Sequence, residues 1–345
     1  MKTGARDVSG ARLRTTVVRA AAILASTLLL AVAVGCAAAP GTPGATVAVA
    51  HNAAAQSGAD RAVSRPAARS ADAAACNPRA ASLRPAPGPP QVTPGSSMAK
   101  ILARGYLIAG VSQSTYNFGY FNPLNGQTEG FDIDMIRAVA TAIFGTPNRH
   151  IEYKAITDDQ RKPDILNGSV DIVAHTMTIS CDRLKSLAFS SVYFEANTRV
   201  LVLKDSKATG LASLGGQKVC ATAGSNSATI ISSYPVTPRL VLVRVPQWTD
   251  CLVLLQQGEV AAVSTDDAIL AGLKAQDPFT KIVGPRLAPQ PYGLAISKQH
   301  PDFVRFVNAV LAQERADGDW AASYVRWVSG PGTAPPSPPT AQYAD

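Results

Sequence analysis

The sequence predicts an α/β fold of two small lobes for residues 98–329. Short apolar stretches of strand length alternate with helix-like segments through this region, a pattern typical of α/β proteins with mostly parallel sheets. The length favours two small lobes over one large sheet. Several strand-like stretches end in small polar residues, and ligands of open α/β sheets bind at the carboxyl ends of strands. The pattern therefore predicts a binding site built from loops.

The individual elements follow from periodicity and helix-start signals. Helical periodicity is clearest over 131–144, where acidic residues stand at the start. Pro163 is compatible with the first turn of a helix over 160–167. Further helices are predicted at 182–187, 250–257, 266–275, 301–315 and 318–328. Strands are predicted at 106–111, 151–156, 170–174, 199–203, 218–221, 240–245, 260–263 and 292–296.

Residues 1–35 have the composition of a bacterial export signal. Five basic residues precede or flank an apolar run over 20–34, which is shorter than the roughly 20 residues that span a bilayer. The run ends at Val32-Ala33-Val34-Gly35-Cys36, which resembles a lipobox with Ala33 where Leu is usual. We therefore expect a lipoprotein signal peptide over 1–35 and lipidation of Cys36, which would hold the protein at the outer side of the cell membrane. An uncleaved anchor helix is the alternative.

Residues 36–97 are mostly Ala, Pro, Gly, Ser and Thr. Such a segment buries too little apolar surface to fold, so we expect a disordered tether. A Pro-rich tail over 330–345 ends the chain. The formal net charge of +8 belongs mostly to the signal and tether segments, because residues 1–97 hold 10 basic and 3 acidic residues. The remaining sequence is nearly neutral, and this excludes a nucleic-acid partner.

Five cysteines are present, and lipidation of Cys36 would leave Cys76, Cys181, Cys220 and Cys251. An even number in an exported protein indicates two disulfides with three possible connectivities. We favour Cys220–Cys251, which closes a moderate loop, together with Cys76–Cys181. A zinc site is the competing interpretation, but the sequence has no C-x-x-C pair and its four histidines are scattered. We expect neither a metal nor a cofactor.

The segment from His175 to Arg183 offers the strongest binding motif. It follows the predicted strand over 170–174 and leads into a short helix. Thr176 and Thr178 can each donate one hydroxyl proton, and Arg183 can donate two parallel N–H bonds to a carboxylate. The alternative is a polar turn capped by Ser180.

Two later loops add polar groups. Gly224-Ser225-Asn226-Ser227 exposes backbone N–H groups at a helix start, a place suited to anions or to a simple helix cap. In Thr265-Asp266-Asp267, one acid could bind an ammonium while the other caps the following helix. Phe118 could form an apolar wall, although an aromatic residue near a strand end is more often part of a core.

The order of motifs resembles the bacterial extracellular solute-binding proteins for polar amino acids, over roughly residues 98–329. The resemblance is closest to the glutamine- and glutamate-binding lipoproteins of actinobacteria. Four segments carry it, namely GQTEGFDID at 126–134, residues 171–183 with Phe189-Ser190, SLGGQKV at 213–219 and PYGLA at 291–295.

This resemblance implies a periplasmic-binding-protein-like fold, with two lobes joined by two hinge strands and a ligand cleft between them. Lobe 1 would span 98–197 plus 292–329, and lobe 2 would span 198–291. The hinges would lie near 195–200 and 289–292.

The same resemblance implies roles for the site residues. Arg183 would bind the ligand α-carboxylate, helped by Thr178 and by the Ser225 and Asn226 region. Thr176 and Asp266 would bind the α-ammonium. Phe118 would cover the aliphatic part, and Arg161 stands where relatives that bind acidic amino acids place an arginine for the side-chain carboxylate. An exposed helix charge is the alternative for Arg161.

The function implied is that of a monomeric, lipid-anchored receptor for glutamate, aspartate or their amides, which delivers its ligand to an ABC transporter permease. An amino-acid sensor that signals through a membrane partner has the same binding chemistry. An enzyme on the same scaffold is disfavoured, because His175, Asp158 and Asp159 offer no evident nucleophile–base pair.

Overall fold

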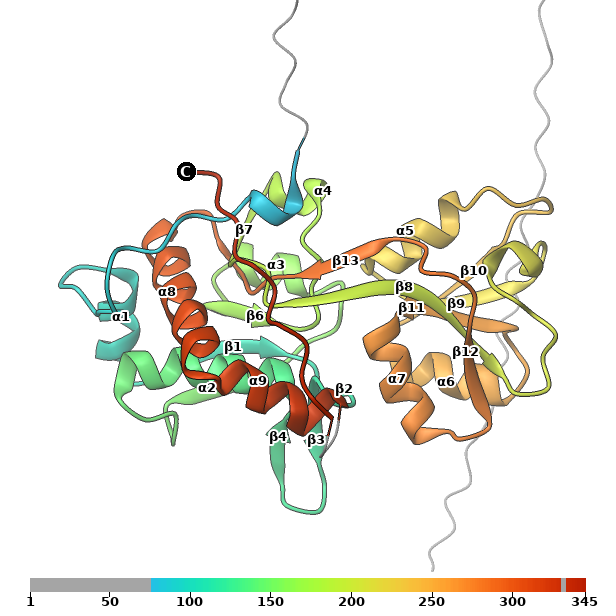
Figure 1. Ribbon diagram of the computed structural model, residues 1–345, viewed down its shortest axis with the longest axis horizontal. Helices are drawn as coiled ribbons and strands as arrows, with labels where there is room; N and C mark the ends of the chain where they lie inside the picture. Colours follow the sequence, from blue (N-terminus) through green and yellow to red (C-terminus); the bar gives the residue numbers. More distant parts are fainter. Residues whose placement is uncertain (1–75, 330–332) are drawn as a thin grey trace, which may run out of the picture. The chain divides into compact units, whose positions relative to one another are not determined.

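A computed structural model describes residues 76–329 and 333–345 (Figure 1). The predicted signal peptide, the lipidation site at Cys36 and the tether up to residue 75 lie outside the described residues. Two α/β lobes are present, each built on its own mixed sheet with helices packed against it. Of the helices in the described ranges, none has the length and apolar character that a membrane span requires.

Lobe 1 contains a five-stranded sheet whose apolar strands are buried among helices. The strand order is β5 (Ile151–Ala155), β1 (Leu107–Val111), β6 (Ile172–Ala174), β14 (Ala295–Ser297) and β7 (Leu187–Phe189). The helices are α1 (Ser97–Arg104), α2 (Phe131–Phe144), α3 (Arg161–Leu166), α4 (Cys181–Leu184), α8 (Pro301–Asp317) and α9 (Asp319–Tyr324), which continues as a π-helix over Val325–Ser329. A small antiparallel sheet is formed by β2 (Ser114–Thr115), β3 (Gly119–Asn122) and β4 (Gln127–Glu129).

Lobe 2 contains the second sheet, with its own core. The strand order is β10 (Val241–Val245), β9 (Lys218–Thr222), β11 (Ala262–Asp266), β8 (Phe194–Leu203) and β12 (Thr280–Val283). Its helices are α5 (Asn226–Ser233), α6 (Trp248–Gln256), α7 (Asp267–Gln276) and the 3₁₀ turn Leu211–Leu214. The disulfide Cys220–Cys251 joins β9 to α6, which confirms the predicted pairing.

Two antiparallel strands connect the lobes. The first half of β8 pairs with β13 (Pro289–Tyr292), and its second half pairs with β11 and β12 of lobe 2 (Figure 1). Tyr292 also forms a bridge with Thr178 of lobe 1. The described residues therefore have the predicted fold class, two lobes joined by two strands.

Three predictions about elements were wrong. The sheets are mixed rather than mostly parallel, because β8 and β14 return antiparallel to their neighbours. The single strand predicted over 292–296 is two strands, β13 and β14, interrupted at Gly293-Leu294. The helix predicted over 182–187 ends at Leu184, since Leu187 starts β7 and is buried in the sheet.

The end of the predicted tether, residues 76–97, is ordered against lobe 1. The 3₁₀ turn Pro78–Ala80 is followed by Ser82, whose hydroxyl donates to the Phe189 carbonyl at 2.7 Å. The predicted disulfide Cys76–Cys181 is formed. The prediction of a disordered tether was therefore wrong for residues 76–97. It rested on the scarcity of large apolar residues, whereas a disulfide and buried hydrogen bonds hold this segment in place.

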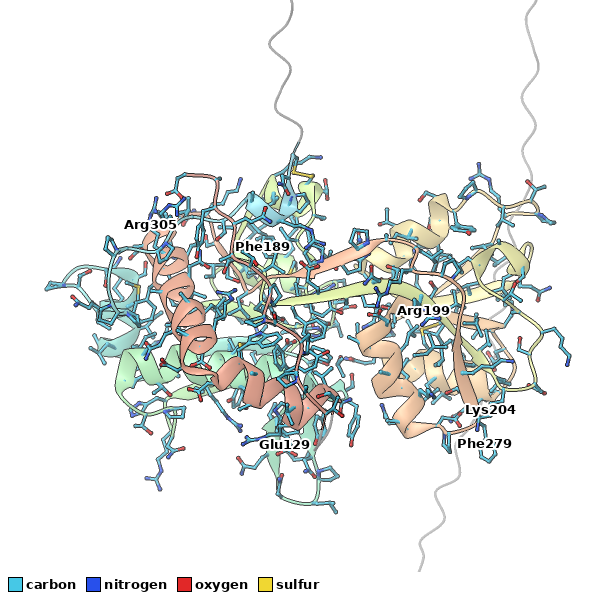
Figure 2. All side chains as sticks on the ribbon, in the orientation of Figure 1. Glu129, Phe189, Arg199, Lys204, Phe279 and Arg305 are labelled. Atoms are coloured by element: carbon cyan, nitrogen blue, oxygen red, sulfur yellow. A yellow bond between two sulfur atoms is a disulfide. The ribbon has the colours of Figure 1, made fainter. Side chains whose placement is uncertain are left out.

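The described part of the predicted tail lies on the same lobe. Tyr343 forms a parallel bridge with Ser82, and the Asp345 carboxylate accepts from the Arg84 backbone at 2.6 Å. Arg305 of α8 pairs with Asp345 at 2.6 Å. Figure 2 shows Arg305 and Phe189 on this lobe.

Candidate functional site

A small cavity of about 10 Å³, roughly the room that one water molecule needs, lies between the two lobes. Seven of the eight predicted ligand-binding residues line it, with residues from both lobes on its wall. The lining residues are Asp158, Arg161, Thr176, Thr178, Arg183, Ser225, Asn226, Ser227, Trp248, Thr265, Asp266 and Ile269. Two acids and two arginines are among them, so the ionised cavity carries no net charge.

Thr176 lies two residues after the end of β6 and has a strained backbone. Its φ is +44°, a conformation that a β-branched residue rarely adopts. The buried Asp132 of α2 holds it there, because its carboxylate accepts from the Thr176 N–H at 2.8 Å and from the Tyr193 hydroxyl at 2.6 Å. The Thr176 hydroxyl oxygen is buried and has no hydrogen-bond partner among the described residues. Strain of this kind is often associated with binding sites.

Arg183 lies in the single turn of α4, where Ser180 caps the helix by accepting from the Arg183 N–H. Its guanidinium donates to the Thr178 carbonyl at 2.7 Å and to the Gly224 carbonyl of lobe 2 at 3.1 Å. Burial lowers the pKa of Arg183 to about 9, so that it remains charged at neutral pH. These two bonds use two of its five N–H groups, which leaves donors for a ligand anion.

Arg161 at the start of α3 is more fully engaged. Its guanidinium lies 3.0 Å from the Asp158 carboxylate, and both side chains are 3% exposed. It also donates to the carbonyls of Asp158 at 2.9 Å, His175 at 3.0 Å and Gly224 at 3.3 Å. Asp158 in turn accepts from the hydroxyl of Thr222 in lobe 2. The guanidinium is therefore already neutralised, and it joins the lobes.

The loop before α5 places Ser225 and Asn226 on the cavity wall, and their side chains make different contacts. Ser225 is the helix cap, since its hydroxyl accepts from the Ala228 N–H at 3.1 Å and donates to the Thr222 carbonyl at 2.8 Å. The Asn226 amide donates to the side-chain oxygen of Gln290 at 2.9 Å, and the Thr178 hydroxyl donates to the same oxygen at 2.8 Å.

Asp266 ends β11 and precedes α7, yet its side chain does not cap the helix. One carboxylate oxygen accepts from the Tyr292 hydroxyl at 2.8 Å, and the other is buried with no partner among the described residues. Burial raises the pKa of Asp266 to about 7. Such a carboxylate is stabilised by a cationic group placed beside it.

Trp248, the first residue of α6, completes the wall. Its indole N–H is buried and lacks a partner in the described parts of the chain. The indole N–H is a donor, the free oxygen of Asp266 is an acceptor, and the Thr176 hydroxyl can be either. The wall of the cavity therefore offers both donors and acceptors. Because unpaired buried polar groups are costly, this set favours a ligand that has both kinds of group.

Phe118 does not line this cavity. It is 1% exposed and packs edge-on against Phe131, Phe194 and Tyr292 in the core of lobe 1. The prediction that Phe118 covers the ligand is therefore not supported by its position, because the turn that carries it points the ring into the core.

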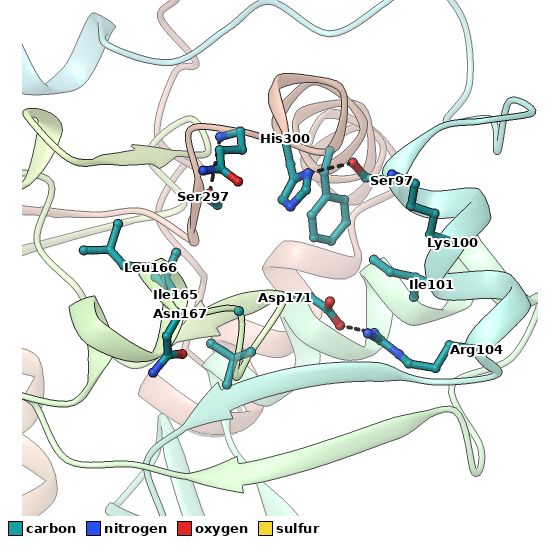
Figure 3. Close-up of a pocket in the computed structure, with 14 residues that line it drawn as sticks. Ser97, Lys100, Ile101, Arg104, Ile165, Leu166, Asn167, Asp171, Ser297 and His300 are labelled. Carbon is teal, nitrogen blue, oxygen red and sulfur yellow. Dashed lines mark hydrogen bonds and ion pairs between the residues drawn. The ribbon is translucent and has the colours of Figure 1, made fainter.

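A larger groove lies on lobe 1 between α1, α3 and α8 (Figure 3). Some of its polar side chains contact one another, since Arg104 pairs with Asp171, and Ser97 lies 3.1 Å from the His300 ring. None of the predicted ligand-binding residues lines it. Size alone therefore does not identify the binding site.

Several residues of the site were not predicted as binding residues from the sequence, among them Trp248. Asp132 and Gln290 act through contacts with residues 44 and 112 positions away, and no local pattern indicates such contacts. Asp158 could have been found, because an acid three residues before an arginine at a helix start is a recognisable ion-pair spacing.

The sequence matches the family described as bacterial extracellular solute-binding proteins, family 3, over residues 107–330. It is 33% identical over 233 residues to an ABC transporter glutamine-binding protein of Bacillus subtilis, covering 67% of this chain and 84% of that protein. It is 26% identical to a glutamate/aspartate import solute-binding protein of Salmonella typhimurium, covering 69% of this chain and 81% of that protein.

Solved structures give the same assignment of fold. A mutant of the arginine-binding protein from T. maritima superposes with a TM-score of 0.63 at 29% identity, covering 68% of this chain and 99% of that one. An ancestral amino-acid-binding protein, a precursor of cyclohexadienyl dehydratase, superposes with a TM-score of 0.62 at 28% identity, covering 67% and 99%.

Proposed function

This chain belongs to family 3 of the bacterial extracellular solute-binding proteins, and we propose that it captures a polar amino acid and delivers it to an ABC transporter. The ligand class is glutamate, aspartate, glutamine or asparagine. We further propose that the protein acts as a monomer anchored to the cell membrane by lipid on Cys36.

The observation that carries this proposal is that Arg183 of lobe 1 and Asp266 of lobe 2 both lie on the wall of one cavity. An amino acid carries a carboxylate and an ammonium, and burying either without a partner costs several kcal/mol. Arg183 offers the donors for the carboxylate, and Asp266 with Thr176 offers acceptors for the ammonium. A ligand that contacts both lobes stabilises the closed arrangement, because it binds that arrangement more tightly.

The relatives support the ligand class. The names of two relatives specify glutamine binding, in Bacillus subtilis and in Geobacillus stearothermophilus, and that of a third specifies glutamate and aspartate import. Arg161 fits the role of side-chain reader poorly, because Asp158 already pairs with it.

An enzyme on this scaffold is the weaker candidate. His175 is 2% exposed, and its ring lies 3.0 Å from the Ile156 carbonyl rather than on the cavity wall. Burial lowers the pKa of His175, which favours a neutral ring. General acid–base catalysis needs a group within reach of the substrate.

Thermal unfolding of the full-length protein with each of the 20 amino acids tests the proposal. A ligand at 100 times its Kd stabilises the folded state by about 2.7 kcal/mol, which is readily measured as a higher Tm. We expect the increase for one or more of Glu, Gln, Asp and Asn. A folded protein whose Tm responds to none of the 20 would contradict the proposal.

A further inference from the structure

Residues 76–82, which we call the N-terminal strap, are attached directly to the helix that carries Arg183. Cys76 forms a disulfide with Cys181, the first residue of α4, and Arg183 is the third residue of the same helix. The other end of the strap is held by lobe 1, since the Ser82 hydroxyl donates to a carbonyl of β7 at 2.7 Å. The helix of Arg183 is therefore tied covalently to a second segment of lobe 1.

Helix α4 has few other contacts that fix it in place. It is a single turn, Cys181–Leu184, and none of its four residues is fully buried. Helices this short are not stable on their own. The chain is held on both sides of the turn, because the Ile179 N–H donates to the Pro291 carbonyl of β13 at 2.7 Å and Leu187 is buried in β7. Within the turn itself, the disulfide is the covalent anchor.

This anchor matters most when the lobes are apart. The cavity has the room of about one water molecule, so the lobes must separate before an amino acid can enter. The Arg183 guanidinium contacts the carbonyl of Thr178 in lobe 1 and that of Gly224 in lobe 2. Opening breaks the contact with Gly224, so that the position of Arg183 then depends on α4 and on the Thr178 carbonyl.

The strap also reaches the strands that connect the lobes. Arg79 forms an ion pair with Glu195 of β8, in the part of that strand that pairs with β13. A cavity of about 260 Å³ lies between the strap and β13, and its wall includes Cys181 together with Thr178 and Asn226 of the binding cavity. Because this space borders α4, side-chain packing alone does not fix the turn on that side.

We propose that Cys76 and Cys181 are positioning residues for the arginine that binds the ligand carboxylate, because their disulfide holds α4 with the Arg183 guanidinium facing the cleft before the ligand arrives. This inference rests on the proposed function. A group that is already oriented loses less conformational freedom on binding. Ordering one mobile arginine weakens affinity by up to about tenfold. Loss of the disulfide therefore weakens amino-acid binding without removing any contact with the ligand.

Calorimetric titration of the full-length protein with Glu, Gln, Asp and Asn tests the proposal. In the double variant Cys76→Ala/Cys181→Ala, the Kd should rise by about tenfold because Arg183 is no longer held in place. Alanine favours the helical conformation of α4 more than cysteine does, so helix propensity cannot cause the loss. Arg84→Ala, at an exposed position just beyond the strap, is the matched control and should leave the Kd unchanged.

Two further measurements separate positioning from general stability. Hydrogen exchange of residues 180–186 in the ligand-free protein should accelerate in the double variant, while exchange in lobe 2 stays unchanged. Combined with Arg183→Met and measured at millimolar ligand, the two cysteine substitutions should alter the Kd by less than about twofold, because they act through Arg183. An unchanged Kd in the double variant, an equal loss in both backgrounds, or exchange that accelerates equally in both lobes would overturn the inference.

If the double variant fails to fold, the folded wild type still decides. Cys76 and Cys181 are exposed, whereas Cys220 and Cys251 are fully buried. A mild phosphine reductant followed by a small alkylating reagent should therefore open and cap the first pair alone, which mass spectrometry verifies. We expect the capped protein to show the same rise in Kd, and unchanged affinity would overturn the inference. A wild type that binds none of the four amino acids would instead overturn the proposed function.

Discussion

The two arginines of the cavity differ in what they can still bind. Arg161 is neutralised by Asp158 and donates to three carbonyls. Arg183 donates to two carbonyls, and no acid is paired with it in the described parts of the chain. The free charge of Arg183 supports its proposed role as the anchor for the ligand carboxylate, whereas Arg161 donates to carbonyls of both lobes.

Replacing Arg183 with Met should weaken amino-acid binding by about 2–5 kcal/mol, because a buried carboxylate would lose its charged partner. The Kd from calorimetry measures the change. Lys185→Met is the matched control, since Lys185 carries the same charge two residues on but is exposed. Equal loss of affinity in both variants would argue against a specific role for Arg183.

Asp266 should make ligand binding depend on pH. A ligand ammonium binds the carboxylate form, and the pKa of Asp266 is raised to about 7 by burial. Below pH 7 binding must first remove the proton, so we expect the Kd to rise by about tenfold per pH unit between pH 7 and pH 5. Asp266→Asn should bind weakly with a flat profile. A wild-type Kd that is constant from pH 5 to pH 8 would exclude this role.

The same pKa predicts the stability of the ligand-free protein. The folded pKa of Asp266, about 7, exceeds the unfolded value of about 3.9. The folded state therefore holds this proton more tightly, and the resulting stabilisation is complete below pH 4 and is lost as pH rises through 7. We compare the free energy of unfolding of Asp266→Asn with that of the wild type at each pH. The difference, variant minus wild type, should be more favourable to the variant at pH 8 than at pH 4 by ~1–4 kcal/mol. Denaturant titration at the two pH values measures this difference.

Positions on the cavity wall were predicted best where they depend on local sequence. Thr176, Thr178 and Arg183 follow one strand end, so that their common placement on the cavity wall could be expected. Phe118 was misplaced because the direction of its ring depends on packing against Phe194 and Tyr292, which are distant in sequence.

At the scale of elements, helix α8 organises the ends of the described chain. Its buried Asn308 accepts from the Ser191 N–H at 2.7 Å and donates to the Ser82 hydroxyl at 2.7 Å and the Leu83 carbonyl at 2.6 Å. One side chain thus joins the segment predicted as tether to the loop after β7.

Asn308→Ala should destabilise the protein by about 2–4 kcal/mol, because it leaves buried backbone groups unpaired. Hydrogen exchange of residues 77–96 should accelerate in the variant. Gln313→Ala, at an exposed position of the same helix, should change neither quantity. If the two variants behave alike, the hydrogen bonds of Asn308 do not hold the segment.

Element boundaries were predictable where local sequence marks them. The helix over Phe131–Phe144 was located at both ends from its periodicity and its acidic first turn, and Gly145 ends it with φ of +77°. The break between β13 and β14 was not, because it depends on a close approach. A Cβ at Gly293 would lie 2.8 Å from the Ile179 side chain, and no alternation pattern reveals such a contact.

At the scale of the whole molecule, glycines allow the lobes to approach. A Cβ on Gly224 of lobe 2 would lie 2.6 Å from the Asp159 Cα, and a Cβ on Gly272 would lie 2.7 Å from the Tyr116 carbonyl oxygen. The second contact offers a clean test, because Gly272 lies within helix α7, where alanine is favoured over glycine by about 1 kcal/mol.

Gly272→Ala should raise the Kd for the amino acid at least tenfold, because the added methyl group obstructs closure, while the stability of the ligand-free protein is maintained or increased. Calorimetry and thermal unfolding measure the two effects. Lys274→Ala on the exposed side of α7 is the control. Unchanged affinity in Gly272→Ala would show that binding does not need this lobe contact.

The most direct test of the account is calorimetric titration of the wild-type protein, freed of prebound ligand, with Glu, Gln, Asp and Asn, repeated with Arg183→Met. We expect the wild type to bind at least one of the four with one ligand per chain, and we expect the substitution to remove most of the affinity. A folded wild type that binds none of them, or binding that is unaffected by the loss of Arg183, would contradict it.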